Sequence, residues 1–349
     1  MVSHGPGGRT TELGLTPFRA GGGFRTGRER RSGWFTETPS AAVDGAKDNA
    51  PLKEDWKHLR AIRAYSALAI SPASRRFSAV FKLALAQMRV EGGAKEANLA
   101  RTEQYIAESA AAGAHVVLLP EALNVGWMHG SARTDADTFP DGEACARLRR
   151  AARVHEIYVC AGLIELAADR LFNAAVLISP TGEILLHHRK LNELDLAHNL
   201  YAQGDRLGVA STPLGTFGLM ICADGFAPRQ MVSRTLGLMG ADVILSPCAW
   251  AVPAEHDNTL EPYGQLWLDN YCPVTRDFDL WIAGCSNVGS INEGPWAGRS
   301  CIGSSYVIDH TGAIAVQGPY GIDAEAMLLV NVIPAERPAR GDQWAKRLA

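Results

Sequence analysis

The sequence lacks the patterns that mark several large classes of protein. No apolar run approaches the roughly 20 residues that a membrane-spanning helix needs. No GxGxxG or GxxxxGK[ST] motif lies between a strand and a helix, and no CxxC or HxxxH pattern indicates a metal site. We therefore expect no nucleotide cofactor, no metal ion and no insertion into a membrane.

The cysteines do not form a disulfide framework. Their number is odd and their spacings are wide, and most of them lie within apolar runs. The pattern favours reduced thiols in a cytoplasmic protein. The seven positions are Cys145, Cys160, Cys222, Cys248, Cys272, Cys285 and Cys301.

Charge is low and unevenly distributed over the 349 residues. Charged residues make up 20% of the chain and hydrophobic residues 47%, as in ordinary globular proteins. The formal net charge of −3 combines +6 over residues 1–76 with −9 over residues 77–349. A mildly acidic body gives no reason to expect a nucleic-acid partner.

The composition divides the chain into four parts. Residues 1–52 are a low-complexity segment rich in glycine and arginine, which we expect to be a flexible arm because it has little apolar surface to bury. Residues 53–76 carry a helical stripe followed by a linker, residues 77–335 form the main domain, and residues 336–349 form a tail. Ser74-Arg75-Arg76-Phe77 is similar to a twin-arginine signal, but the apolar stretch after it is short and contains Lys82, so we expect no export.

The main domain alternates strands and helices. Strand patterns alternate with helical ones up to residue 164, as in βαβ units, and β-hairpins with turns at 180–182, 214–215 and 310–312 become frequent after that. Two mixed sheets packed face to face, each covered by helices, would accommodate this order. The expected strands are 81–88, 115–119, 157–164, 171–179, 183–190, 208–211, 217–221, 242–246, 281–287, 305–309, 313–317 and 327–332, and the expected helices are 94–112, 143–154, 229–238 and 261–275.

Three of these strands end at a reactive side chain. Leu119-Pro120-Glu121, His188-Arg189-Lys190 and Ile221-Cys222-Ala223-Asp224-Gly225 each follow an apolar run. A cysteine between a strand and a helix lies beside free backbone N–H groups, which we expect to lower the pKa of the thiol. A carboxylate, an ammonium and a thiol at one sheet edge would supply a general base, an oxyanion partner and a nucleophile.

In their order along the chain these motifs resemble those of the nitrilase superfamily of carbon–nitrogen hydrolases, over about residues 80 to 335. The Cys-Ala-Asp-Gly sequence is more similar to the aliphatic amidase and formamidase branch than to true nitrilases, which have Cys-Trp-Glu. The resemblance implies an α-β-β-α sandwich, an enzyme and a homodimer. It also implies a small amide as substrate, Glu121, Lys190 and Cys222 as catalytic residues, and Lys190 with the Ala223 N–H as the oxyanion site. We expect Asp224 to fix the turn after the cysteine rather than to react.

One departure from the family pattern leaves alternatives open. The amidase branch has a second glutamate eight residues after the lysine, and this position is His198 here. His198 could replace the glutamate, Glu193 or Asp195 could reach the site from a rearranged loop, or the protein could be a non-catalytic scaffold. Hydrolysis of nitriles or N-carbamoyl compounds and acyl transfer from the same cysteine are further alternatives.

Several aromatic and polar residues are candidates for substrate contacts. They lie on segments that the resemblance places around the pocket, and a pocket rich in aromatic residues and poor in arginine would suit a small neutral amide. The candidates are Tyr201, Phe226, Trp250 and Asn287, with His256 and Tyr263 unranked beside them.

Overall fold

The computed structural model describes residues 80–335. The predicted flexible arm, the predicted helix and linker over 53–76, and the predicted tail over 336–349 lie outside these residues.

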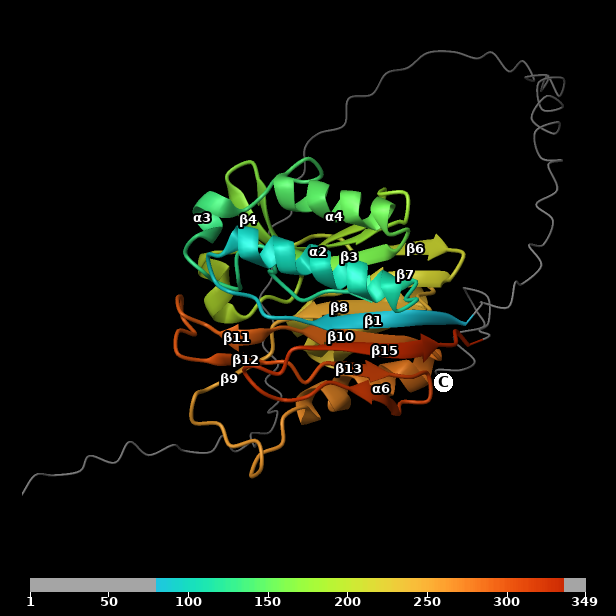
Figure 1. The fold of residues 1–349 in the computed structure, drawn as a ribbon. Coiled ribbons are helices and arrows are strands. Elements are labelled where there is room, and N and C mark those ends of the chain that lie inside the picture. Colours follow the sequence, from blue (N-terminus) through green and yellow to red (C-terminus); the bar gives the residue numbers. More distant parts are fainter. Residues whose placement is uncertain (1–79, 336–349) are drawn as a thin grey trace, which may run out of the picture. The chain divides into compact units, whose positions relative to one another are not determined.

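Two six-stranded sheets form the centre of the described domain (Figure 1). In spatial order the first sheet contains β15 (Ala326–Val332), β1 (Phe81–Gln87), β2 (Val116–Leu118), β3 (Tyr158–Ala167), β4 (Arg170–Ile178) and β5 (Ile184–Arg189). The second sheet contains β14 (Ile314–Gln317), β13 (Tyr306–Ile308), β10 (Trp281–Ser286), β8 (Val243–Cys248), β7 (Gly215–Leu219) and β6 (Val209–Thr212).

Each sheet combines a parallel centre with antiparallel edges. In the first sheet β1, β2 and β3 run parallel, and in the second sheet β7, β8 and β10 do so. The outer strands are antiparallel neighbours joined mainly by hairpins. The carboxyl ends of the central strands therefore gather at one edge of each sheet, where side chains from distant parts of the sequence can meet.

Helices cover the outer faces of both sheets. Figure 1 shows α2 (Lys95–Ala111) and α4 (Glu143–Val154) on one side of the stacked sheets and α6 (Gln265–Phe278) on the other. The remaining helix of the second layer is α5 (Met231–Leu238), which contacts α6. The predicted four-layer α-β-β-α sandwich with two mixed sheets is confirmed.

Strand β1 shows how the sequence builds these layers. Phe81, Leu83 and Leu85 pack between the two sheets, whereas Ala84 and Ala86 pack under α2 and α4. Successive side chains of a strand point to opposite faces, so a strand covered on both sides needs apolar residues at every position. This is why residues 83–86 of β1 are apolar without alternation, whereas the polar Lys82 and Gln87 lie near the two ends of the strand.

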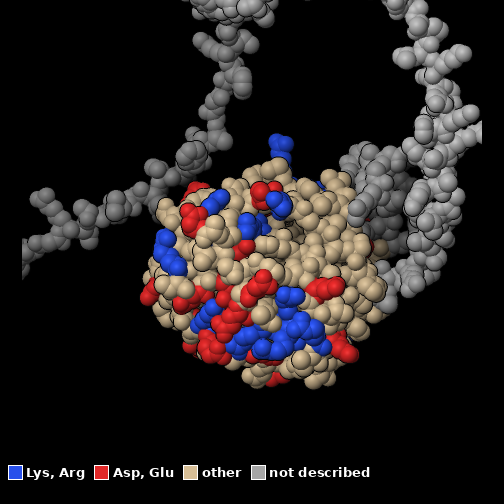
Figure 2. Space-filling view, turned by 90° about the horizontal axis from the view of Figure 1, so that it is seen from above, with Lys and Arg blue, Asp and Glu red and all other residues tan. Residues whose placement is uncertain are grey.

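The helical layer over the first sheet carries its charges in pairs. Arg147 of α4 contacts Glu96 and Glu103 of α2 at 2.7 and 2.6 Å, and Lys95 contacts Asp137 at 2.9 Å. The space-filling view of this side shows Lys and Arg next to Asp and Glu (Figure 2). Charges of both signs leave this face without a broad patch of one sign.

The expected elements differ from the observed ones mainly at their ends. The helix expected over 261–275 begins at Gln265, because Gly264 at φ 129° is its N-cap, and it continues past Pro273 to Phe278. A three-stranded sheet of β11, β12 and β9 was not expected, since its strands are only two or three residues long. Its strands are β9 (Ala251–Val252), β11 (Val288–Ser290) and β12 (Ser300–Ile302), and the short helix α3 (Ala132–Asp135) was also not expected.

Within residues 80–335, no helix combines the length and the apolar composition that crossing a membrane requires.

Candidate active site

Glu121 lies just beyond the end of β2, and its position is fixed from three sides. Its backbone N–H donates to the carbonyl of Cys248 at 3.1 Å. Its carboxylate Oε1 accepts hydrogen bonds from Asn173 Nδ2 at 2.6 Å and from Lys190 Nζ at 2.8 Å. Gly162 of β3 allows this close approach, because a Cβ there would lie 2.6 Å from the Cα of Glu121.

Lys190 reaches Glu121 because of the alternation along β5. His187 and Arg189 point to one side, where both contact the buried carboxylate of Glu165. His188 and Lys190 point to the other side, into the domain, and both are buried. The strand pattern therefore separates the two adjacent cations and directs only Lys190 to the site.

The Lys190 side chain is held as an ammonium. Burial alone would lower its pKa, but the negative charges of Glu121 and Glu193 raise the pKa well above the ordinary value for lysine. Glu193 lies with its Oε2 at 3.6 Å from Nζ. A buried ammonium between carboxylates is a fixed positive charge, which can stabilise an oxyanion.

Cys222 follows β7 at the start of the short 3₁₀ helix Cys222–Phe226. Its backbone adopts φ 42°, a left-handed conformation that is costly for a residue with a side chain. The side chain is half-buried and packs against both the inter-sheet core and the core under α5 and α6. The turn thus presents the sulfur at the end of the sheet.

Asp224 holds this turn against the segment that carries Lys190. Its Oδ2 accepts from the backbone N–H of Ile221 at 2.9 Å and from His188 Nε2 at 2.8 Å. Its Oδ1 accepts from the N–H groups of Leu191 and Asn192 at 3.0 and 2.7 Å. Burial would raise the pKa of Asp224, but the hydrogen bond and charge of His188 together with these N–H groups lower it. The expected role of Asp224 in fixing the turn is confirmed.

The expected low pKa of the Cys222 thiol is wrong. Contact with the Cys248 thiol is the largest cause that raises this pKa, followed by burial and by the negative charge of Glu121. The positive charge of Lys190 lowers it, but not enough to reverse the direction. These surroundings of Cys222 therefore favour the neutral thiol over the thiolate.

Glu193, not His198, lies beside Lys190. His198 is exposed at the surface, as is Asp195, so of the candidates for the second glutamate it is Glu193 that reaches Lys190. The short 3₁₀ helix Asp195–Asn199 turns away from the site, and the chain just before it brings the Glu193 side chain inward instead. Both carboxylate oxygens of Glu193 are buried and accept no hydrogen bond. Burial raises the pKa of Glu193 to about 7, although the charge of Lys190 opposes this.

Two of the predicted substrate residues have partners within the protein. The hydroxyl of Tyr201 accepts a hydrogen bond from the backbone N–H of Met128 at 2.8 Å, and so supports the loop that follows Glu121. Phe226 is half-buried with its ring 5.5 Å from that of Trp267.

Trp250 and His256, two further predicted substrate residues, each carry a buried polar atom without a hydrogen-bond partner. Trp250 stacks on Trp267 with ring centroids 4.6 Å apart, and its Nε1 has no acceptor. His256 Nε2 is likewise buried without a partner, and Tyr263 OH accepts from Trp267 Nε1 at 2.9 Å. Such donors and acceptors are available to a bound molecule.

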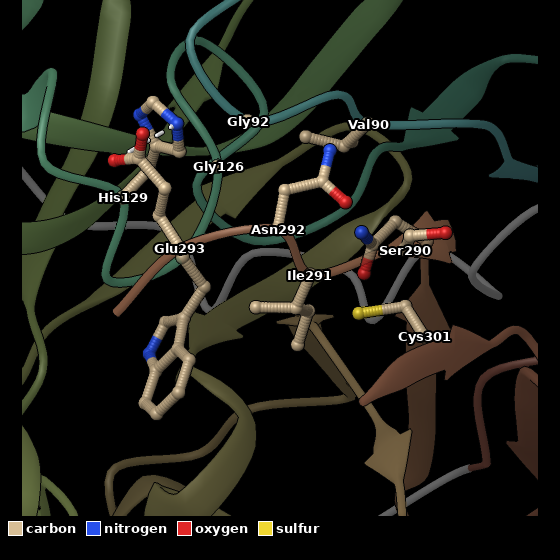
Figure 3. Close-up of a pocket in the computed structure, with 11 residues that line it drawn as sticks. Val90, Gly92, Gly126, His129, Ser290, Ile291, Asn292, Glu293 and Cys301 are labelled. Carbon is tan, nitrogen blue, oxygen red and sulfur yellow. Dashed lines mark ion pairs between the residues drawn. The ribbon is translucent and has the colours of Figure 1, made fainter. Parts of the chain in front are cut away.

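Asn287 lines a small pocket at the end of β10. Its Oδ1 is buried and unpaired, and Cys301 lines the same pocket. Figure 3 shows Cys301 on one side of this pocket and the pair of His129 and Glu293, 3.3 Å apart, on the other. Asn287 therefore borders a space, but the pocket lining does not include Glu121, Lys190 or Cys222.

Two residues that contact the site were not predicted from the sequence. Asn173 donates a hydrogen bond to Glu121. The sequence feature that could have indicated this residue is a single asparagine within the apolar run of β4. Cys248, at the end of β8, lies next to Cys222 and seemed to be one more buried thiol.

Among residues 80–335, no group of three or more His, Cys, Asp or Glu side chains is arranged to hold a metal ion.

Comparison with known proteins gives matches of three kinds, to a family model, to curated proteins and to solved structures. The family model described as carbon-nitrogen hydrolase matches residues 82–333. Similar curated proteins include a nitrilase from Pyrococcus abyssi, 33% identical over 177 residues that make up 49% of this chain and 66% of that protein. An omega-amidase from Mus musculus is 32% identical over 154 residues, 41% of this chain and 55% of that protein.

The matches to these two relatives thus span between about half and two thirds of their length. Among solved structures, an amidase from Nesterenkonia sp. is similar with a TM-score of 0.61 at 21% identity, over 74% of this chain and 92% of that chain. At this identity the likeness shows the fold.

Proposed function

The chain belongs to the carbon–nitrogen hydrolase family, and we propose on that premise that it hydrolyses a small non-peptide amide through a thioester on Cys222. The observation that carries the proposal is the contact of Lys190 Nζ with Glu121 Oε1 at 2.8 Å, in a buried site where both charges act on the Cys222 thiol. The contact of Lys190 with Glu121 and the influence of both charges on Cys222 support a common site for the three residues.

In the first step Glu121 acts as the base. Its Oε1 is occupied by Asn173 and Lys190, so we assign the proton transfer to Oε2. The Cys222 thiol has a raised pKa, which makes this base necessary. As Sγ attacks the amide carbon, the carbonyl oxygen becomes an oxyanion between Lys190 Nζ and the N–H of Ala223. The first N–H groups of a helix have no acceptor within it.

The second step breaks the carbon–nitrogen bond. Glu121 returns its proton to the leaving nitrogen, ammonia or an amine departs, and the acyl group remains on Sγ. Glu121 then takes a proton from water, the hydroxide adds to the thioester, and the carbon–sulfur bond breaks. The proton returns to the thiolate. Covalent catalysis of this kind divides one difficult step into two easier ones.

Glu193 would bind the amide nitrogen or the attacking water. Both of its oxygens are buried without hydrogen bonds, 3.6 Å from Lys190 at the nearest. The absence of the family's second glutamate was the reason to consider a non-catalytic scaffold. A buried glutamate at this place removes that reason.

Hydrolysis of a nitrile is the second candidate, because the curated relatives include a nitrilase and cyanide hydratases. The two candidates are separated by incubating the protein with a panel of amides, nitriles and N-carbamoyl compounds and measuring ammonia. We expect ammonia from a small amide, and none with Cys222→Ala. Activity on nitriles alone would favour the second candidate, and activity that survives in Cys222→Ala would contradict both.

A further inference from the structure

The end of β8 carries a second thiol at the proposed nucleophile. Cys248 is completely buried. Its sulfur lies 3.2 Å from the backbone carbonyl oxygen of Ser246 and 3.4 Å from the Ser246 hydroxyl oxygen. The backbone carbonyl of Cys248 accepts a hydrogen bond from the N–H of Glu121 and helps to hold that residue in place. The thiol of Cys248 takes no part in the proposed reaction. The side chain is therefore a reactive group without a role.

The turn after β7 brings Cys222 next to the end of β8, where Cys248 lies. The parallel ladder of β7 and β8 pairs Leu219 with Leu245, and the N–H of Met220 donates to the carbonyl of Leu245 at 3.2 Å. β7 ends at Leu219, and the turn that follows it, Cys222–Phe226, packs against β8, whose last residue is Cys248. Cys222 and Cys248 pack in the same apolar core, and a disulfide joins cysteines whose Cα atoms lie roughly 4.4 to 6.8 Å apart. Contact with Cys248 is also the largest influence on the Cys222 thiol.

The two thiols differ in access. Cys222 is half-buried, so part of the residue faces solvent, whereas Cys248 has no exposed surface. This is the arrangement of an attacked thiol and a resolving thiol. From it we propose that Cys222 and Cys248 are a modification site, at which a hydroperoxide forms a reversible disulfide that blocks the nucleophile.

The chemistry requires one hydroperoxide for each disulfide. Glu121 takes the proton of the Cys222 thiol and the sulfur attacks one peroxide oxygen. The oxygen–oxygen bond breaks, the departing oxygen takes that proton and leaves as an alcohol or water, and Cys222 becomes a sulfenic acid. The Cys248 sulfur then attacks the Cys222 sulfur, the sulfur–oxygen bond breaks, and hydroxide leaves with the Cys248 proton as water. Two thiols lose two electrons in total, and the peroxide gains them.

Cys248 also changes what oxidation does to the enzyme. A sulfenic acid without a neighbouring thiol is oxidised further to a sulfinic acid, which ordinary reductants do not reverse. A buried partner thiol stops the oxidation at the disulfide. The inference rests on the proposed function only for the loss of activity, since the covalent link itself can be measured without a substrate.

The test is oxidation of the full chain with hydrogen peroxide, followed by intact mass and peptide mapping. We expect the wild type to lose about 2 Da, with the link between the peptides of Cys222 and Cys248, and a dithiol reductant to restore the mass. Activity on the best amide should fall in proportion to the linked fraction and return on reduction. Cys248→Ser should instead gain about 32 Da at Cys222 and not recover.

Cys301→Ser is the matched control, because Cys301 is also buried beside the site and its thiol is affected by the charge of Cys222. This variant should form the same link as the wild type. The proposal is overturned if the wild type gains oxygen instead of forming the link, or if the link joins Cys222 to Cys301. A link formed in a protein that hydrolyses no amide would refute the proposed function and leave the modification site standing.

Discussion

Replacing Glu193 with glutamine should make the protein more resistant to alkaline pH. The Glu193 carboxylate is buried, accepts no hydrogen bond, and has only the charge of Lys190 at 3.6 Å to offset its burial. Burial therefore raises its pKa from an ordinary value near 4.5 to about 7. Glutamine has nearly the same shape and no charge to bury.

The size and sign of the effect follow from this pKa. Because the folded pKa lies above the unfolded one, the stabilising contribution of the protonated side chain is fully present below about pH 4.5 and is lost as the pH rises through 7. At about 1.4 kcal/mol per pKa unit, the wild type should lose about 2 to 3 kcal/mol of unfolding free energy between pH 5 and pH 8 through this group. Glu193→Gln should not lose it.

The assay is urea unfolding of wild type and Glu193→Gln at pH 5, 6, 7 and 8, with Glu183→Gln as a control at an exposed glutamate. The difference in unfolding free energy between Glu193→Gln and wild type should grow toward high pH, and the control should follow the wild type. A difference that stays constant from pH 5 to pH 8 would show that Glu193 is already ionised in the folded protein and that its burial is not the dominant effect.

Three further substitutions test how the site is held. Gly162→Ala places a Cβ 2.6 Å from the Cα of Glu121, so we expect kcat to fall on the order of 100-fold, and an unchanged kcat would show that this spacing is not critical. Asn173→Leu removes the 2.6 Å hydrogen bond to Glu121 and should lower kcat about 10- to 100-fold in steady-state kinetics, whereas an effect on KM alone would contradict a role in holding the base. Asp224→Asn breaks a buried pair with His188 and should lower the unfolding free energy by about 3 to 5 kcal/mol in urea denaturation, and wild-type stability would mean that the turn is held by other contacts.

Much of the fold could be predicted because the strands are buried on both faces. Runs such as Phe81–Gln87 and Val243–Cys248 are mostly apolar, and turns with glycine separate the later hairpins. The ends of α6 could not be predicted in the same way, since Gly264 begins the helix and Pro273 lies inside it without ending it. The strands of the small third sheet are too short to give a periodic pattern.

The convergence of Glu121, Lys190 and Cys222 was predictable from motifs at three strand ends, but their electrostatics were not. The pKa of Cys222 depends on the neighbours Cys248 and Glu121, which are 26 and 101 residues away in sequence. The choice between Glu193 and His198 depends on how the loop after β5 turns, and sequence spacing carries no information on that.

The central claim is that Cys222 carries the acyl group during turnover. It is tested most directly by mixing the protein with its fastest amide substrate, quenching in acid during the steady state, and locating added mass by peptide mapping. We expect the mass of the acyl group on the peptide that contains Cys222, and no added mass with Cys222→Ala. Turnover without an adduct in the wild type, or an acyl group on Cys248, would contradict the claim.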